Sequence, residues 1–191
     1  MSDPVANSEP RIGRAQINGR ELFICDNMID PQMVQHIGAI ARKLNYLRTE
    51  RSRADTPVTA GSADISAQAL AGEPFFQRLR EIAAQLFPGE RLSDQRAYIN
   101  SSTYGDDYYI HRDCGIDVKH VTLLYYVNLE WEPQWGGETI LYDDNYDAQV
   151  VVSPRPGRLV ASRGSILHRG TVPTRTCYEQ RLTLAYKLLA A

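Results

Sequence analysis

Two histidines and one aspartate follow an order that suits a shared metal ion. His111 and Asp113 are separated by one residue, and His168 comes much later in the chain. Side chains two positions apart at the end of a strand point to the same side, so His111 and Asp113 can hold one cation that His168 reaches from a distant strand. Two histidines and a carboxylate leave three coordination positions open, which suits non-haem Fe(II) that also binds a cosubstrate and O₂. Taken alone, a His-x-Asp pair is more often a surface pair.

The last predicted strand carries a basic and a hydroxyl side chain on one face. Arg181, Thr183 and Ala185 alternate with apolar residues, so Arg181 and Thr183 share a face. A guanidinium beside a hydroxyl can clamp the far carboxylate of a dicarboxylate whose other end chelates a metal. Arg181 is the preferred clamp because it alone among the candidate arginines heads an alternating apolar strand. The rival arginines are Arg163, Arg169 and Arg175.

The first half of the chain predicts a hairpin and two helices. Asn18-Gly19 is a favoured tight-turn pair, which predicts a hairpin over 11–26. An N-cap at Asp30, Pro31 at the first helical position and a repeat of apolar residues predict an amphipathic helix up to residue 47. A second helix is predicted from Glu73 to residue 86, where Pro88 and the next glycine end it.

The segment 48–72 between the helices is polar and long for a plain connection. It predicts a loop, either a solvated one or a mobile lid. Three arginines at its start form a solvated face by default, and a cationic lid would suit a substrate with a carboxylate or phosphate. These arginines are Arg48, Arg51 and Arg53.

From residue 95 onward the sequence predicts short strands without intervening helices, which favours a sandwich or a double-sheet barrel over βαβ units. The strands are expected at 97–101, 108–111, 121–129, 138–142, 149–153, 158–161, 166–170 and 181–188.

These motifs together resemble the Fe(II)/2-oxoglutarate-dependent oxygenases, most closely their prolyl-hydroxylase-like branch. The resemblance covers about residues 98–188, and the motifs follow the order of the family. It implies an α+β, mainly β fold with a double-stranded β-helix (jelly-roll, cupin-like) core and N-terminal helices packed on one sheet. The motifs are His111-x-Asp113, Tyr125-Tyr126-Val127-Asn128, Trp135-Gly136-Gly137-Glu138, His168 and Arg181-x-Thr183.

The resemblance also implies roles for individual residues. His111, Asp113 and His168 would bind the iron and carry the catalysis, and Arg181 with Thr183 would bind 2-oxoglutarate. Tyr126, and Tyr104 or Tyr98 from the strand before the metal motif, would offer hydroxyls to the cosubstrate. The implied cofactors are Fe(II), 2-oxoglutarate and O₂, with ascorbate as a candidate reductant.

The implied reaction is hydroxylation of an unactivated C–H bond, with release of succinate and CO₂. The intact carboxylate of Asp113 favours hydroxylation over halogenation, while desaturation and ring closure stay open. The substrate is expected to be a small molecule or an amino acid, with a prolyl or other protein side chain as an open alternative. A homodimer is open as well.

Composition excludes several other classes. The chain has 191 residues and a net charge of −2, which argues against a nucleic-acid partner held by a basic face. No apolar run approaches the ~20 residues of a membrane span, and residues 1–10 lack the order of a signal peptide, so a cytoplasmic protein is expected. We expect one domain over 11–191, with helical support at 30–88, a catalytic β core at 95–189 and a loose N-terminus at 1–10.

Two other functions compete with an oxygenase. A non-catalytic double-stranded β-helix could bind a small molecule or a protein and use the His/Asp cluster only structurally. A zinc hydrolase would share the three ligands, but it leaves Arg181 without a role and lacks an obvious general base.

Overall fold

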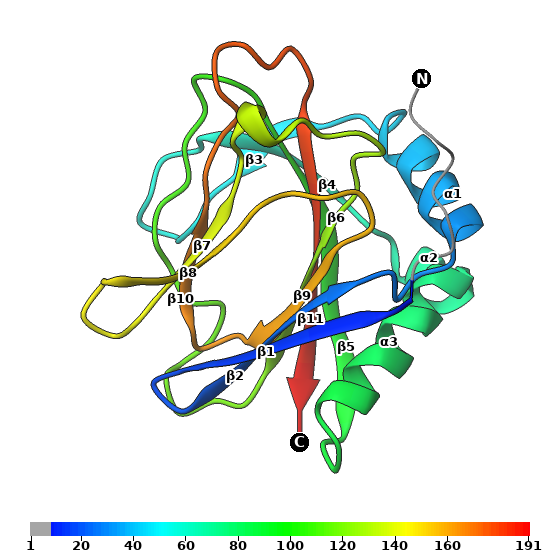
Figure 1. Cartoon of the computed structure of the whole chain (residues 1–191), viewed down its shortest axis with the longest axis vertical. Helices are drawn as coiled ribbons and strands as arrows, with labels where there is room; N and C mark the ends of the chain where they lie inside the picture. Colours follow the sequence, from blue (N-terminus) through cyan, green and yellow to red (C-terminus); the bar gives the residue numbers. More distant parts are fainter. Residues whose placement is uncertain (1–8) are drawn as a thin grey trace.

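The computed structural model describes residues 9–191, and its strands form two antiparallel sheets (Figure 1). The predicted loose N-terminus falls mostly on residues 1–8, which lie outside the described part. The strands of the larger sheet are β1 (Arg11–Ile17), β2 (Arg20–Asp26), β3 (Leu47–Glu50), β4 (Ala60–Asp64), β5 (Leu92–Ser102), β6 (Val121–Tyr126), β9 (Leu159–Arg163) and β11 (Arg181–Ala190), and those of the smaller sheet are β7 (Thr139–Tyr142), β8 (Ala148–Val152) and β10 (Leu167–Gly170).

The order of the strands confirms the predicted double-stranded β-helix. The larger sheet runs β1-β2-β9-β6-β11-β5-β4-β3 and the smaller one β10-β7-β8. Apolar residues from both sheets, among them Leu22, Tyr126, Leu141 and Val152, pack into one buried cluster. The two sheets therefore face each other, and the inner face of the larger sheet is available to form a site.

The predicted hairpin is formed by β1 and β2. Asn18 and Gly19 have φ angles of 49° and 74°, which is the left-handed backbone that a two-residue hairpin turn requires. The two strands pair in register from Ile17 opposite Arg20 outward.

Within residues 9–191, three α-helices cover the outer face of the larger sheet: α1 (Pro31–Ala41), α2 (Ala67–Gly72) and α3 (Pro74–Leu86) (Figure 1). Asp30 caps α1, because its carboxylate accepts hydrogen bonds from the backbone N–H groups of Gln32 and Met33. The apolar face of α3, with Phe75, Phe76 and Leu79, packs against β5, β6 and β11 in the main core.

The prediction of a loop over 48–72 was wrong. The first helix ends at Ala41 instead of residue 47, and the segment that follows contributes β3, β4 and α2. β4 consists of small and polar residues, and its pairing with β5, for example Gly61 with Ser101, defines it. Residues 51–59 remain irregular. This stretch contacts the segment before the metal motif, because the guanidinium of Arg53 donates a 3.0 Å hydrogen bond to the carbonyl of Ile110.

The strand predicted at 108–111 is reduced to a single bridge. His111 and His168 exchange two backbone hydrogen bonds of 3.0 and 2.9 Å, and the residues before His111 are irregular. A short connection from β6 leads through the 3-10 helix η1 (Pro133–Trp135) into β7. Among residues 9–191, no helix is long and apolar enough to cross a lipid bilayer.

Candidate metal and cosubstrate site

His111, Asp113 and His168 meet between the two sheets. One ligand atom from each lies within 4.8 Å of the other two. The Nε2 atoms of His111 and His168 are 3.6 and 3.7 Å from the carboxylate oxygens of Asp113. The backbone bridge between the histidines brings the distant strand β10 to the His-x-Asp segment, so the three predicted side chains converge.

Backbone carbonyls orient both imidazoles. Nδ1 of His111 lies 3.0 Å from the carbonyl oxygen of Tyr109, and Nδ1 of His168 lies 3.0 Å from that of Ile166. A carbonyl can only accept, so Nδ1 carries the proton in both rings, and Nε2 of the neutral imidazole keeps its lone pair for a metal. Burial, and next the neighbouring His111, lowers the pKa of His168, which favours the neutral form that binds a metal.

Asp113 is held as a carboxylate by its surroundings. Its side chain is 6% exposed, and burial alone would raise its pKa. The nearby His168, His111 and Lys187 outweigh burial and lower the pKa of Asp113 well below its usual range. The hydroxyl of Thr122 donates a 2.6 Å hydrogen bond to one oxygen, and the ammonium of Lys187 lies 2.8 Å from the other.

This donor set fits a divalent metal with open coordination positions. Two neutral imidazoles and one carboxylate suit Fe(II), and within residues 9–191 no further His, Cys, Asp or Glu joins the cluster. The remaining positions on a bound ion would be free for a chelating cosubstrate and O₂.

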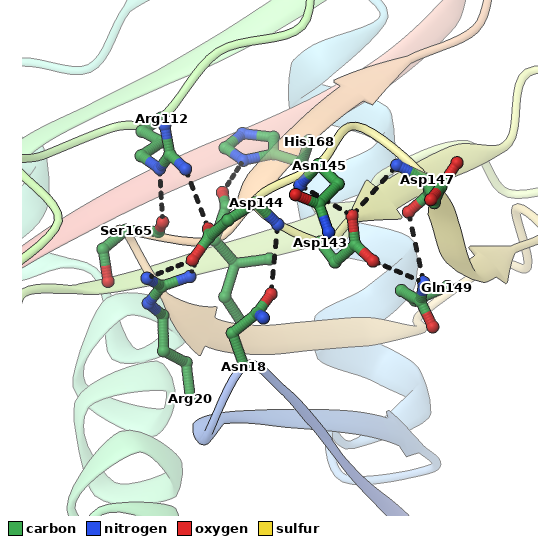
Figure 2. Close-up of polar contacts among 11 residues, drawn as sticks. Asn18, Arg20, Arg112, Asp143, Asp144, Asn145, Asp147, Gln149, Ser165 and His168 are labelled. Atoms are coloured by element: carbon green, nitrogen blue, oxygen red, sulfur yellow. Dashed lines mark hydrogen bonds and ion pairs between the residues drawn. The ribbon is translucent and has the colours of Figure 1, made fainter.

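Arg112 lies between the ligand residues His111 and Asp113, and its side chain ties this segment to neighbouring loops (Figure 2). Its guanidinium donates to Asp144 at 2.8 Å and to the carbonyl of Ser165 at 3.0 Å. Asp144 lies in the turn between β7 and β8 and also receives two hydrogen bonds from Arg20, of 2.8 and 3.0 Å. We call Arg20, Arg112 and Asp144 the latch, because they join the β1–β2 hairpin, the β7–β8 turn and the metal-binding segment.

The turn that presents Asp144 is itself fixed. The carboxylate of Asp143 accepts hydrogen bonds from the backbone N–H groups of Asn145 and Asp147 and from the side chain of Gln149, at 2.9, 3.0 and 2.9 Å (Figure 2). The side chain of Asn18 accepts from the backbone N–H of Asp144 at 3.1 Å. The β7–β8 turn and the β1–β2 turn therefore both hold Asp144 in position.

Arg181 is a buried cation without a carboxylate partner. Its exposed fraction is 2%, and in residues 9–191 no carboxylate lies within 4.0 Å of its guanidinium. Its three nitrogens donate to the carbonyl of Gly137 at 2.6 Å and to the hydroxyls of Thr183 and Thr139 at 3.1 Å each. Neutral acceptors leave its charge uncompensated, so the site is built to receive an anion.

Gly137 makes room for this guanidinium. A Cβ atom at Gly137 would meet the Cδ of Arg181 and the ring of Trp131 at 3.0 Å each, and the φ of 78° is itself unfavourable for other residues. Gly137 belongs to the Trp135-Gly136-Gly137-Glu138 motif, and the structure gives it a definite packing role against Arg181 and Trp131.

A cavity connects the arginine to the metal cluster. The cavity volume is about 50 Å³, and the space between the lining side chains is about 510 Å³ when the open solvent at its mouth is included. Besides the three ligands, its lining includes Glu50, Tyr98, Asn100, Tyr108, Arg181 and Thr183. Glu50 comes from β3, which the sequence analysis had taken for a loop.

The structure separates the predicted tyrosines. Tyr104 is 63% exposed and is not part of the cavity lining, so the chain does not bring it to the site. The ring of Tyr126 lies 5.6 Å from the guanidinium of Arg181, outside the lining, and its hydroxyl donates to the carbonyl of Val152 at 3.0 Å. Tyr98 lines the cavity, as does Tyr108, which the sequence analysis missed.

Buried polar atoms without a partner mark the same cavity. The hydroxyl of Tyr108 and the side-chain oxygen of Asn100 have no hydrogen-bond partner among the described residues. Burial raises the pKa of Tyr108 to about 12, against a smaller opposite effect of Arg181, so the hydroxyl stays protonated and can donate. A hydroxyl that can donate but has no partner, beside an uncompensated cation, indicates a missing anionic ligand.

None of the three rival arginines lines the cavity. The Nε of Arg169 is buried without a hydrogen-bond partner among the described residues. Arg163 is paired with Glu21 and Glu90 at 2.8 and 2.9 Å, and Arg175 is exposed. Of the three arginines at the start of the 48–72 segment, Arg48 is paired with Asp106 at 2.8 Å.

Residues 98–186 match the model of the 2OG-Fe(II) oxygenase superfamily. This segment is a 2OG-Fe(II) oxygenase domain. The match begins at Tyr98 and spans all three metal-site residues and Arg181. Fe(II), 2-oxoglutarate and O₂ are thus the cofactor and cosubstrates of this dioxygenase, and the His/Asp/His cluster fits the iron. No curated protein sequence matches the chain.

Solved structures of other oxygenases share the fold. A prolyl-4-hydroxylase from Pseudomonas putida is 22% identical with a TM-score of 0.64, over 89% of this chain and 92% of its own. A prolyl hydroxylase from Trichoplax adhaerens, in complex with a hypoxia inducible factor peptide, is 17% identical with a TM-score of 0.66, over 88% and 83%.

A third neighbour has a different activity. The non-heme alpha-ketoglutarate-dependent epimerase of nogalamycin biosynthesis is 14% identical with a TM-score of 0.64, over 88% of this chain and 77% of its own. The fold of the oxygenase therefore leaves the reaction open, and the site residues must decide it.

Proposed function

We propose that this dioxygenase is a hydroxylase that inserts oxygen into an unactivated C–H bond. One atom of O₂ enters the substrate as a hydroxyl group and the other enters succinate, as 2-oxoglutarate loses CO₂. His111, Asp113 and His168 hold the iron, which supplies the oxidation when it is bound. The substrate is a small molecule, an amino acid or a protein side chain.

The observation that carries this proposal is the position of Arg181. A buried cation without an anion lies at one end of the cavity, and an open metal-binding face lies at the other. 2-Oxoglutarate has a carboxylate for the guanidinium and a keto acid for the metal. A zinc hydrolase or a purely structural His/Asp cluster gives Arg181 no role.

We assign further cosubstrate contacts to Thr183 and Tyr108. Thr183 already accepts from Arg181 and shares the cavity face of β11. The orphaned hydroxyl of Tyr108 takes the role that the sequence analysis gave to Tyr104. Tyr126 supports the arginine from behind, through Thr139, whose hydroxyl lies within 2.8 Å of the Tyr126 hydroxyl.

An anaerobic titration with Fe(II) and 2-oxoglutarate tests the proposal. We expect a weak visible charge-transfer band that needs both additions and vanishes in His168→Ala. Arg181→Met should raise the 2-oxoglutarate concentration needed for the band by at least about tenfold, because a charge-assisted pair is lost. Arg175→Met, an exposed arginine, is the matched control. A band that forms equally well in Arg181→Met would contradict the assignment.

Uncoupled turnover separates the oxygenase from the alternatives. With O₂ admitted, the wild type should release succinate in an iron-dependent manner, and candidate substrates should accelerate the release. A non-catalytic binding module would consume no 2-oxoglutarate, and a zinc hydrolase would act without O₂.

A further inference from the structure

The cavity face of β11 continues past the cosubstrate residues to a second cation. Arg181, Thr183 and Ala185 line the cavity, and Lys187 is the next residue on that face because side chains alternate along a strand. Its ammonium lies 2.8 Å from Asp113, at the metal-bearing end and away from Arg181. The cavity lining thus contains one cation, Arg181, and a second cation, Lys187, lies next to the lining residues Asp113 and Tyr98.

Lys187 has a cationic neighbour. Arg96 lies opposite it on β5, and both groups lie over the ring of Tyr98, at 4.2 Å for the Arg96 guanidinium and 5.6 Å for the Lys187 ammonium. Arg96 is paired with the exposed carboxylate of Asp64. Like charges directly opposite in a sheet are unfavourable, so this corner of the cavity attracts anions.

The only ion-pair partner of Lys187 among residues 9–191 is the metal ligand Asp113. A divalent ion bound to Asp113 would compensate the negative charge of that carboxylate, which then compensates less of the positive charge of Lys187. Because the Lys187 side chain is only 21% exposed, water compensates its ammonium poorly. The metal-loaded site therefore needs a new anion next to Lys187.

Glu50 supplies the opposite charge on another wall of the cavity. Its side chain lines the cavity from β3, and within residues 9–191 it forms no ion pair within 4.0 Å. Burial raises the pKa of Glu50, and the nearby charges of Arg96, Lys187 and His111 offset this only in part. An unpaired carboxylate here favours a cationic ligand group.

We propose that the substrate is zwitterionic, a free amino acid or a small derivative that keeps both charged groups, with its ammonium on Glu50 and its carboxylate on Lys187. This inference rests on the proposed function, since it places the substrate beside metal-bound 2-oxoglutarate. An internal residue of a protein has neither charge. It would bury Glu50 and Lys187 without partners, and an unpaired buried charge opposes binding strongly.

Four small probes separate the two charges. Glycine has both groups, N-acetylglycine only the carboxylate, glycinamide only the ammonium, and N-acetylglycinamide neither. Each is titrated anaerobically into the protein loaded with Fe(II) and 2-oxoglutarate, and the paramagnetic broadening of its methylene proton signal gives a dissociation constant. Glycine should bind tightest, and loss of either charge should weaken binding about tenfold.

Two variants assign the charges to residues. Glu50→Gln should reduce the affinity for glycine to that for N-acetylglycine, and Lys187→Met should reduce it to that for glycinamide, whereas Lys187→Arg should retain most of it. Lys43→Met and Glu81→Gln, exposed residues on or beside the outer helices, are matched controls. Direct chelation of iron by glycine would be insensitive to Glu50, so this variant also separates chelation from binding at the subsite.

The outcomes distinguish this inference from the proposed function. If the charge-transfer band with 2-oxoglutarate does not form, the proposed function fails and the inference fails with it. If the band forms, the inference alone is overturned by equal affinity for N-acetylglycinamide and glycine, by wild-type affinity for glycine in both Glu50→Gln and Lys187→Met, or by no saturable binding of any probe. Preference for the neutral probe would indicate a peptide substrate.

Discussion

The guanidinium of Arg112 lies 2.8 Å from the carboxylate of Asp144, which ties the residue between two metal ligands to the turn of a distant hairpin. Loss of this contact should loosen the metal site, although neither residue touches the ion. We expect Asp144→Asn to weaken Co(II) or Mn(II) binding about tenfold, as measured by calorimetry, because groups that orient ligands have effects of this size.

A second ion pair provides the control for that variant. Asp26 receives two hydrogen bonds from Arg158, of 2.7 and 2.8 Å, and has no contact with the metal segment. Asp26→Asn should lower the free energy of unfolding about as much as Asp144→Asn does, by ~1 kcal/mol or less, and leave metal affinity unchanged. Equal metal affinities in the two variants would refute a positioning role for the latch.

The latch also predicts a pH dependence of stability. Hydrogen bonds from Arg20, against a smaller effect of burial and with help from Arg112, lower the pKa of Asp144 from 3.8 to about 2. A carboxylate whose pKa is lower in the folded state stabilises the fold at every pH above its unfolded pKa. This stabilisation is lost as the pH falls from the unfolded pKa through the folded pKa. The difference in unfolding free energy between wild type and Asp144→Asn should shrink from pH 4 to pH 2, as followed by denaturant titration; a difference independent of pH would contradict it.

A side chain at Gly137 should weaken 2-oxoglutarate binding, and this effect should exceed what its backbone strain alone would cause. Gly137→Ala brings a Cβ within 3.0 Å of Arg181 at a φ of 78°, whereas Gly89→Ala has a similar φ of 84° with nothing within 4 Å. Both variants should lose ~1–2 kcal/mol of stability. Only Gly137→Ala should raise the KM for 2-oxoglutarate, by about tenfold or more, because the guanidinium must move. Equal KM values in the two variants would rule out this role.

Two tyrosine variants test the orphaned hydroxyl. Tyr108→Phe removes a group without a partner, so the free protein should keep its melting temperature while the KM for 2-oxoglutarate rises about tenfold. Tyr126→Phe removes a satisfied hydrogen bond, so it should lower stability by ~1 kcal/mol and change KM less. The opposite pattern would show that Tyr126 is the cosubstrate contact.

The fold could be predicted where local chemistry agrees with tertiary structure. Asn18-Gly19 specifies its turn, Asp30-Pro31 specifies a helix start, and the alternation from Arg181 onward specifies a strand. β3 and β4 could not be predicted in this way. The exposed pattern of β3 and the small residues of β4 carry no apolar period, and both strands depend on pairing across the sheet, such as Ser62 with Asn100.

The site residues, too, could be predicted where local sequence determines them and not where tertiary structure does. Spacing and side-chain chemistry indicated His111, Asp113, His168 and Arg181, which the structure places around one cavity. Tyr104 was a weaker inference because an irregular segment has no side-chain period to fix which residue turns inward, and Tyr108 is the one that does. Lys187 could have been predicted from the sequence, because the alternation that places Arg181 and Thr183 on one face also places Lys187 there, two residues after Ala185.

β11 lies at the middle of the larger sheet, between β5 and β6, although both precede it by far in the sequence. During synthesis those two strands must wait for their shared neighbour, and loop closure over such a distance is slow. Arg181 and Lys187 arrive on this same strand. No partly folded chain can therefore present a finished pocket, so oxidative chemistry begins only after the polypeptide has closed around it.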